Sequence, residues 1–246
     1  MKREKETMRG EDVENFINKV KRSPSTLLCG CRKYHEIEQR DIPYVVSWYL
    51  MRNTENPHFV LAGAKTMVLT WNAMYYQWLP TDVKANLEKD IMDSYYACKP
   101  YLDYFRSKNL AQLSRKDIEK IGDIFYTFSS KKSIGFTGAS KILHLINPNV
   151  FMMWDAGIRG AYHKLHREKK HGDRECYIEF MCQSQEIARE LLKITNEDEL
   201  WKEHLSFVVD RDFVQAFSFR ESILKMLDEC NYVKFTRNFD FDCDMP

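Results

Sequence analysis

The chain has 246 residues, of which 44% are hydrophobic and 30% are charged, and its formal net charge is +1. This is ordinary globular composition, and a chain of this length can bury a sizeable core without disulfides or a structural metal. Only 9 glycines and 7 prolines occur, which argues against a β-sandwich with many tight turns. Leu, Lys, Glu, Met and Ala recur in blocks, and these helix-forming residues predict an all-α protein.

The sequence contains no apolar run long enough to span a bilayer, and residues 1–18 lack the apolar core of a signal peptide. Seven cysteines at irregular spacings favour free thiols over a disulfide framework. Cys29, Cys31 and His35 have the spacing of half a metal site, but no second pair of ligands follows, so we predict no metal or other cofactor. We therefore expect an intracellular monomer in a reducing compartment, cytoplasmic, nucleoid-associated or nuclear.

In chain order, residues 1–40 are predicted to form a polar arm with one short helix near 12–21, and residues 41–246 a single all-α domain. Pro80 and Pro148 mark helix ends, and Pro100 is expected to interrupt a helix. One strand is conceivable near 232–235. The helices expected in the domain cover residues 43–52, 65–78, 82–98, 114–128, 132–145, 156–169, 175–194, 198–209 and 213–230.

Two helix starts have clear local signatures. Ser114 and Asp117 form the S-x-x-D pattern of a capping box. Asp155 directly precedes an apolar helical pattern, and aspartate is a preferred N-cap residue. Both residues predict a sharply defined first turn in the helix that follows.

The most informative stretch is residues 130–162, SKKSIGFTGASKILHLINPNVFMMWDAGIRGAY. It has a lysine-bearing turn, a glycine-containing helix, a proline loop, and then Trp154-Asp155 opening a second helix. Gly135 and Gly138 each cost roughly 1 kcal/mol inside a helix relative to alanine. Such a cost is accepted where another backbone approaches closely, either a neighbouring helix or a phosphate.

This stretch resembles the helix-hairpin-helix DNA glycosylases over about thirty residues. That family has a catalytic lysine near a helix start, a proline loop, and an apolar run that ends in an aspartate opening the next helix. The run from Lys132 to Thr137 looks like the lysine-led helix start of the archaeal 8-oxoguanine DNA glycosylases. The usual hairpin, Leu-Pro-Gly-Val-Gly-x-Lys, is absent, as is the four-cysteine iron–sulfur motif of some members.

The resemblance implies a helix-hairpin-helix glycosylase-like bundle that excises a damaged or modified base from double-stranded DNA. Asp155 would stabilise the positive charge that develops on the sugar. A lysine would attack C1′ as a neutral amine and form a Schiff base, which permits strand cleavage. Lys132 and Lys141 are both candidates, and we favour Lys132 because a helix N-terminus disfavours an ammonium.

An excised base must leave the stack and enter a pocket with aromatic walls. The candidates for these walls are Phe136, Phe151, Trp154 and Trp71, with Tyr75 and Tyr76 as neighbours of Trp71. Residues 129–174 are strongly basic, as phosphate contacts require. The residues predicted to contact DNA are Gly135, Gly138, Lys164, Arg167, Lys169 and Lys170.

Plainer interpretations stay open for each of these residues. Asp155 could act only as a helix cap, Lys132 could be a solvated surface lysine, and His144 could be an ordinary core histidine. The alternative function is a non-catalytic all-α module that binds nucleic acid or a protein partner. The enzyme hypothesis requires that a lysine amine and the Asp155 carboxylate face the same cleft.

Overall fold

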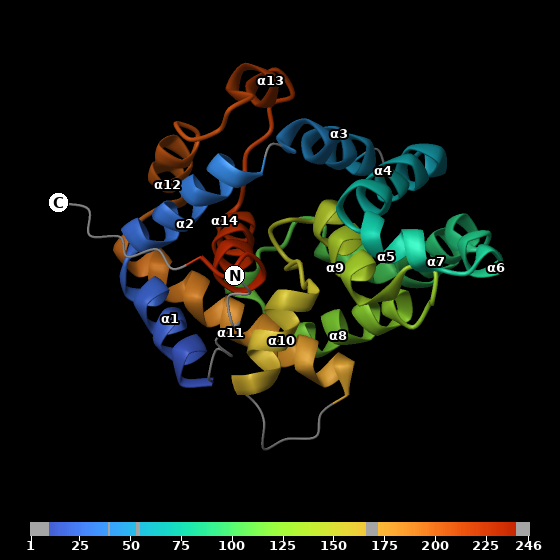
Figure 1. Ribbon diagram of the computed structural model, residues 1–246, viewed down its shortest axis with the longest axis horizontal. Coiled ribbons are helices and arrows are strands. Elements are labelled where there is room, and N and C mark those ends of the chain that lie inside the picture. Colours follow the sequence, from blue (N-terminus) through green and yellow to red (C-terminus); the bar gives the residue numbers. More distant parts are fainter. Residues whose placement is uncertain (1–9, 39, 53–54, 166–171, 240–246) are drawn as a thin grey trace, which may run out of the picture.

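The computed structural model describes residues 10–38, 40–52, 55–165 and 172–239. Within these ranges the chain is helical and contains no strand, which confirms the all-α prediction (Figure 1). The elements are α1 (Gly10–Arg22), α2 (Pro24–Ile37), α3 (Asp41–Arg52), α4 (Pro57–Trp71), α5 (Ala73–Trp78), α6 (Thr81–Lys84), α7 (Leu87–Phe105), the 3₁₀ turn η1 (Leu110–Gln112), α8 (Arg115–Ser129), α9 (Gly135–Ile146), α10 (Ala156–Leu165), α11 (Asp173–Ile194), α12 (Glu197–His204), α13 (Arg211–Ala216), α14 (Ile223–Asn231) and the π-helix η2 (Tyr232–Thr236).

Helices α1 and α2 belong to the body of the protein. Val13 and Val20 of α1 are at most 1% exposed, and α1 packs against α10 and α11 while α2 packs against α14. The apolar residues of α1 recur at helical spacing, so one face is buried although the segment is rich in charge. Residues 10–37 therefore differ from the polar arm that the sequence suggested for residues 1–40.

The predicted helix over 65–78 is in fact two helices. α4 ends at Trp71, and Asn72 has φ −118° and ψ 23°, which turns the chain before α5 begins. The second helix is largely exposed, and Trp78 keeps 79% of its surface accessible. The prediction of one buried helix was wrong because asparagine, a residue common at helix C-termini, ends α4 in mid-pattern.

Other boundaries also differ from expectation. Pro100 lies inside α7 without interrupting it; the carbonyl that it leaves unpaired belongs to the exposed Tyr96, where water can satisfy it. The predicted helix 213–230 is split into α13 and α14, and residues 232–235 are part of a π-helix and not a strand. The helix expected from residue 132 begins only at Gly135.

The centre of the core lies where α8 and α11 pack together and α8 also contacts α9. Phe125 of α8 stacks on Tyr177 of α11 with ring centroids 3.9 Å apart. The capping box at the start of α8 is confirmed, since Ser114 and Asp117 exchange side-chain to backbone hydrogen bonds. This packing fixes α9, which carries Lys141, against the rest of the bundle.

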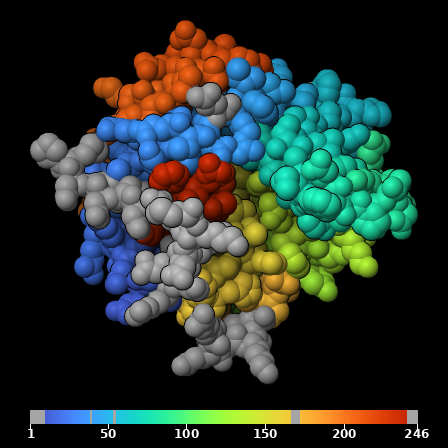
Figure 2. Space-filling view, viewed as in Figure 1, coloured from blue at the N-terminus to red at the C-terminus, as the bar shows by residue number. Residues whose placement is uncertain are grey.

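The C-terminal helices complete the fold around this centre. α14 packs against α2 and α11, and η2 packs against α10. Figure 2 shows the C-terminal segment, in red, reaching the surface between α2 and the segment around α10. Residues far apart in sequence, from α2 to η2, are thus gathered on one side of α9.

Two further properties bear on the sequence predictions. Cys31, Cys98, Cys176, Cys182 and Cys230 are free thiols, whereas Cys29 is disulfide-bonded. None of the helices in the described ranges combines the length and apolarity needed to cross a membrane.

Candidate active site

Lys141 lies on the inner side of α9 and is only 7% exposed. Its amine donates a hydrogen bond of 2.9 Å to the carbonyl oxygen of Trp71, at the end of α4. Burial lowers the pKa of Lys141 to about 8, and the negative charges of Asp155 and Asp228 only partly oppose this effect. About a tenth of the amine is therefore unprotonated at pH 7.

Asp155 caps α10, as the sequence predicted. Its Oδ1 atom accepts hydrogen bonds from the backbone N–H groups of Gly157, at 2.8 Å, and Ile158, at 3.0 Å. The hydroxyl of Thr236 in η2 also donates to the carboxylate, at 2.7 Å from Oδ1 and 2.8 Å from Oδ2. A Cβ atom on Gly157 would lie 2.5 Å from Thr236 Oγ1, so glycine permits this close approach.

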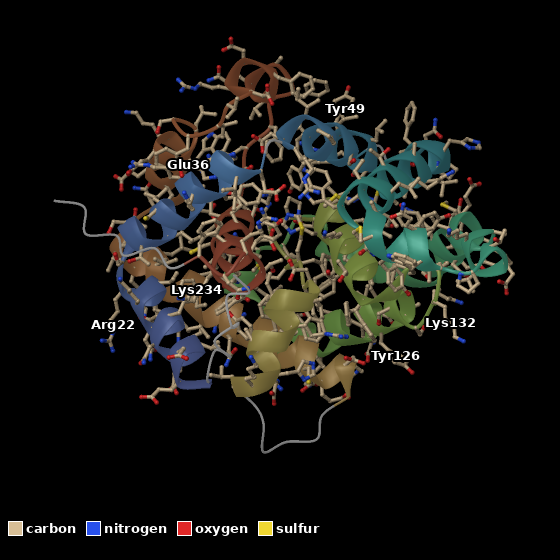
Figure 3. The ribbon with its side chains drawn as sticks, in the orientation of Figure 1. Arg22, Glu36, Tyr49, Tyr126, Lys132 and Lys234 are labelled. Atoms are coloured by element: carbon tan, nitrogen blue, oxygen red, sulfur yellow. The ribbon has the colours of Figure 1, made fainter. Side chains whose placement is uncertain are left out.

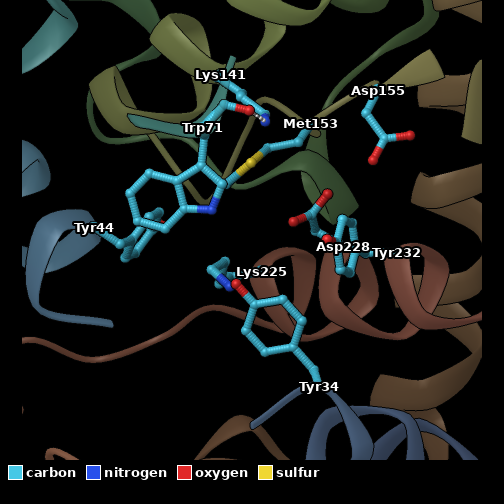
Figure 4. Close-up of a pocket in the computed structure, with 9 residues that line it drawn as sticks. All are labelled: Tyr34, Tyr44, Trp71, Lys141, Met153, Asp155, Lys225, Asp228 and Tyr232. Atoms are coloured by element: carbon cyan, nitrogen blue, oxygen red, sulfur yellow. Dashed lines mark hydrogen bonds between the residues drawn. The ribbon is translucent and has the colours of Figure 1, made fainter. Parts of the chain in front are cut away.

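Lys141 and Asp155 line the same pocket (Figure 4). The pocket encloses about 380 Å³ of empty space, part of it open to solvent. Only a small part of this space is wide enough for a water-sized sphere. The residues that line it are Tyr34, Tyr44, Trp71, Lys141, Met153, Asp155, Lys225, Asp228 and Tyr232.

The pocket holds a second lysine and a second carboxylate, both from α14. Burial alone would lower the pKa of Lys225, but the charge of Glu229 raises it well above its usual value, and the amine donates to Glu229 Oε1 at 2.6 Å. Burial raises the pKa of Asp228 to about 7; Lys225 opposes the rise and Asp155 adds to it. Lys225 is thus a fixed cation, whereas Lys141 can lose its proton near neutral pH.

Aromatic side chains form the remaining walls of the pocket. The Tyr44 and Trp71 rings meet edge to face, with centroids 6.1 Å apart. The Lys225 amine lies 4.7 Å from the ring centre of Tyr34 and 5.0 Å from that of Tyr44, within cation–π distance. In Figure 4, Trp71 and Tyr44 lie on one side of the pocket, and Asp155 and Asp228 lie with Tyr232 on the other.

Lys132 is not part of this pocket. It is exposed, lies in the turn before α9, and sits at the edge of the molecule in Figure 3. Its carbonyl oxygen accepts a hydrogen bond of 2.7 Å from the hydroxyl of Tyr75. The spatial requirement of the enzyme hypothesis is therefore met by Lys141 and Asp155, and the preference for Lys132 has no support in the geometry.

Of the four predicted pocket aromatics, only Trp71 lines the pocket. Phe151 and Trp154 are fully buried core residues, and Trp154 stacks near Phe180 with centroids 6.2 Å apart. Phe136 is partly exposed and carries the guanidinium of Arg159 at 4.8 Å from its ring centre. The apolar run before Asp155 is thus mainly core, although Met153 from the same run reaches the pocket.

The two glycines of α9 have structural roles. Gly135 has φ +66°, and a Cβ there would lie 2.9 Å from the Tyr75 ring. A Cβ on Gly138 would meet the Ile134 side chain at 3.2 Å and the side chains of Asn72 and Val68 at 3.5 and 3.7 Å, so Gly138 faces the end of α4. Lys164 is partly exposed near the end of α10. The other predicted DNA contacts, Arg167, Lys169 and Lys170, lie outside the described residues.

His144 is a core histidine, as the plainer interpretation expected. It is fully buried, with Tyr44 Oη 2.8 Å from Nε2 and the Phe151 carbonyl oxygen 2.7 Å from Nδ1. Burial lowers its pKa to about 3, so the ring is neutral. Lys225 and Asp228 were missed by the sequence analysis, although the charged residues Lys225, Asp228 and Glu229 in the largely apolar run ILKMLDEC were a usable signal.

Comparison with protein-family models, with curated proteins and with solved structures finds no match to this chain.

Proposed function

We propose that the protein is a DNA glycosylase that excises a damaged or modified base and forms a Schiff base through Lys141. The observation that carries this proposal is the buried lysine, with a pKa of about 8, that lines one pocket with the helix-capping carboxylate of Asp155. The resemblance of residues 130–162 to helix-hairpin-helix glycosylases supplies the reaction class. The proposal transfers the nucleophile role from Lys132 to Lys141.

The reaction begins with the neutral amine of Lys141. As the N-glycosidic bond breaks, its electron pair leaves with the base, which is protonated, and the lysine nitrogen bonds to C1′. One N–H proton of the adduct then passes to O4′ as the C1′–O4′ bond opens, which gives a protonated imine between Lys141 and the sugar and leaves O4′ as a hydroxyl. Asp228 is the pocket group best suited to relay that proton because its pKa is about 7.

Asp155 contributes its charge at the moment of bond breaking. A sugar losing its base develops positive charge at C1′, and a fixed carboxylate nearby lowers that barrier. The two backbone N–H donors and the Thr236 hydroxyl hold the Asp155 carboxylate in place.

An extruded base must widen the pocket, since little of its present space admits even a water molecule. Met153 is the flexible member of the lining, and methionine adapts easily to a new neighbour. Trp71, Tyr34 and Tyr44 then offer aromatic faces for stacking. The lesion that fits is a planar purine or pyrimidine derivative in double-stranded DNA.

Borohydride trapping on a panel of damaged and modified duplexes tests this proposal. Borohydride reduces the imine to a stable amine, so a covalent protein–DNA adduct reports the nucleophile directly. We expect an adduct with wild-type protein and none with Lys141→Gln. If no duplex on the panel yields base release or an adduct, the chain is instead a non-catalytic all-α module, and duplex binding alone would then mark it as a nucleic-acid-binding one.

A further inference from the structure

A second buried cluster of ionisable side chains lies beside the pocket, where α2, α12 and α14 meet. His35 belongs to α2, His204 ends α12, Glu229 belongs to α14, and Glu221 precedes α14. All four residues are buried, and His204 and Glu229 have no exposed surface. The atoms that face one another are the Nε2 atoms of both histidines and one carboxylate oxygen of each glutamate.

Hydrogen bonds alone do not satisfy this arrangement. His204 Nε2 lies 3.3 Å from His35 Nε2, 2.8 Å from Glu229 Oε2 and 3.2 Å from Glu221 Oε2. An imidazole nitrogen carries either one proton or one lone pair, so it can bond to only one of these three neighbours. Glu221 Oε2 is correspondingly a buried oxygen without a hydrogen-bond partner among the described residues, which is costly.

The cluster also contains more carboxylates than ammonium groups. The cluster contains the carboxylates of Glu221 and Glu229, and Asp41 adds a third, 3.2 Å from His35 Nδ1. Lys225 is the lysine paired with the cluster, so, apart from the histidines, three carboxylates face one ammonium group. Protonating both histidines would balance the charge but would set two N–H groups head to head at 3.3 Å.

We propose that His35, His204, Glu221 and Glu229 bind a divalent transition-metal ion of the zinc class. Zinc takes nitrogen and oxygen ligands at about 2.0–2.2 Å in a tetrahedron, so its ligand atoms lie roughly 3.3–3.5 Å apart. Four of the six separations between these ligand atoms, the three from His204 Nε2 and the one from His35 Nε2 to Glu229 Oε2, are 2.8, 3.2, 3.3 and 3.6 Å and scatter around that value. An ion of charge +2 also removes the charge imbalance and gives Glu221 Oε2 a partner.

The surroundings match those of known metal sites. Asp41 lies against the far nitrogen of His35, the carboxylate–histidine–metal arrangement that orients a ligand. Lys225 holds the other oxygen of Glu229 at 2.6 Å. The Cys31 sulfur is within 4.8 Å of the His204 and Glu229 ligand atoms, but its thiol donates to the Met226 carbonyl oxygen, so we do not include it in the ligand set.

The site is structural in kind. Four protein ligands close a tetrahedral shell and leave no open position for a substrate. The ion would join α2, α12 and α14, which are brought together from positions 35 to 229 of the chain. This inference does not depend on the proposed base excision, because its ligands are not among the groups that line the pocket.

Zinc analysis of the purified full-length chain tests the site. We expect one zinc ion per chain by elemental analysis after dialysis, loss of the ion to a strong chelator, and a lower melting temperature without it. Cobalt(II) in its place should show the intense visible bands of tetrahedral coordination. Glu221→Gln should weaken zinc binding by about tenfold or more, and His204→Gln should abolish it.

The controls are Glu203→Gln and His58→Gln, since both residues are exposed. Both should bind zinc as the wild type does. If His204→Gln fails to fold, the milder Glu221→Gln variant still decides, because it retains the shape of the side chain. Equal zinc binding by wild type and Glu221→Gln, or no zinc uptake by folded wild type, would overturn the site and leave a buried ion-pair network.

Discussion

The amine of Lys141 lies 2.9 Å from the carbonyl oxygen of Trp71, a residue 70 positions earlier in the chain. This is a neutral partner, and Lys141 forms no ion pair with a described residue. A buried lysine held by a carbonyl and not by a carboxylate keeps a lowered pKa, because the charges of Asp155 and Asp228 only partly compensate the lost hydration of the ammonium. The pair thus leaves part of the Lys141 population unprotonated near neutral pH.

The first prediction distinguishes the two lysines. Lys141→Gln should abolish borohydride-trapped adducts, because glutamine has no nucleophilic amine. Lys132→Gln is the matched control and should trap at the wild-type yield, since Lys132 is exposed and outside the pocket. Circular-dichroism melting curves should show that both variants fold. The opposite pattern, with trapping abolished only in Lys132→Gln, would return the nucleophile role to Lys132.

The second prediction concerns pH. With a pKa of about 8, about a tenth of Lys141 is neutral at pH 7 and about nine tenths at pH 9. Imine formation should therefore rise with pH and level off above about pH 9. An abasic duplex is the suitable substrate, because it requires no base excision. A pH-independent trapping rate between pH 6 and 9 would contradict the assignment.

The same experiment can test the neighbouring charge. Asp155 raises the pKa of Lys141, so Asp155→Asn should move the midpoint of the pH profile to a lower value. Asp198→Asn, which alters an exposed carboxylate on α12, should leave the midpoint unchanged. An unshifted midpoint in Asp155→Asn would mean that the two groups do not interact across the pocket.

The third prediction concerns base excision itself. Asp155→Asn should fold, because asparagine also caps helices well. Single-turnover release of the base should nevertheless fall roughly 10²- to 10³-fold, since the variant has no negative charge facing C1′. Trapping on an abasic duplex should persist, which separates a failed excision step from a damaged pocket. Wild-type excision rates in this variant would remove Asp155 from the mechanism.

The fourth prediction concerns stability. The pKa of Asp228 is raised to about 7 in the folded protein, from a usual value of 3.8. The folded state thus holds a proton more tightly than the unfolded state, so the contribution of Asp228 to stability is full below about pH 4 and is lost as pH rises to about 7. Asp228→Asn should therefore raise the free energy of unfolding more at pH 8 than at pH 5.

The gain from Asp228→Asn should be a few kcal/mol at most, because a shift of one pKa unit corresponds to about 1.4 kcal/mol. Urea unfolding at the two pH values measures it. Asp82→Asn, at an exposed position of α6, is the control and should show no such pH dependence. A variant less stable than wild type at pH 8 would show that Asp228 is ionised and well paired.

The fifth prediction concerns DNA binding. Residues 129–174 carry an excess of basic side chains, so affinity for duplex DNA should fall steeply as salt increases. We expect weaker binding to all sequences alike from Lys164→Ala and from the double variant Lys169→Ala with Lys170→Ala. The slope of log affinity against log salt concentration should fall by about one for each phosphate that the variant no longer neutralises. Fluorescence anisotropy measures both effects. Affinity that does not respond to salt would point to the protein-interaction alternative.

The sequence predicted those features that depend on neighbours in the chain. The capping box at Ser114 and the cap at Asp155 were visible because a cap needs only its own first turn. The choice between Lys132 and Lys141 was not visible, because it depends on burial by α4 and α14. Local reasoning favoured the helix start, whereas the tertiary structure buries the lysine in mid-helix.

The sequence analysis missed the charged residues of α14 because their role, too, depends on tertiary contacts. Lys225, Asp228 and Glu229 lie on α14, and their neighbours come from α2, α3 and α12. No spacing rule relates His35 to His204, which are 169 residues apart. The sequence did offer a warning, since three charged residues occur in an apolar helix that must be buried on nearly all sides.

The hydrogen bond from Thr236 to Asp155 has a consequence for the order of events during synthesis. The two residues are 81 positions apart, and Thr236 lies in the last described helix of the chain. A nascent chain that has passed residue 160 already contains Lys141 and Asp155 but lacks the hydroxyl that fixes the carboxylate, as well as the α14 wall of the pocket. Lys141 is therefore synthesised long before its burial is complete, and its lowered pKa should appear only after the C-terminal helices have docked.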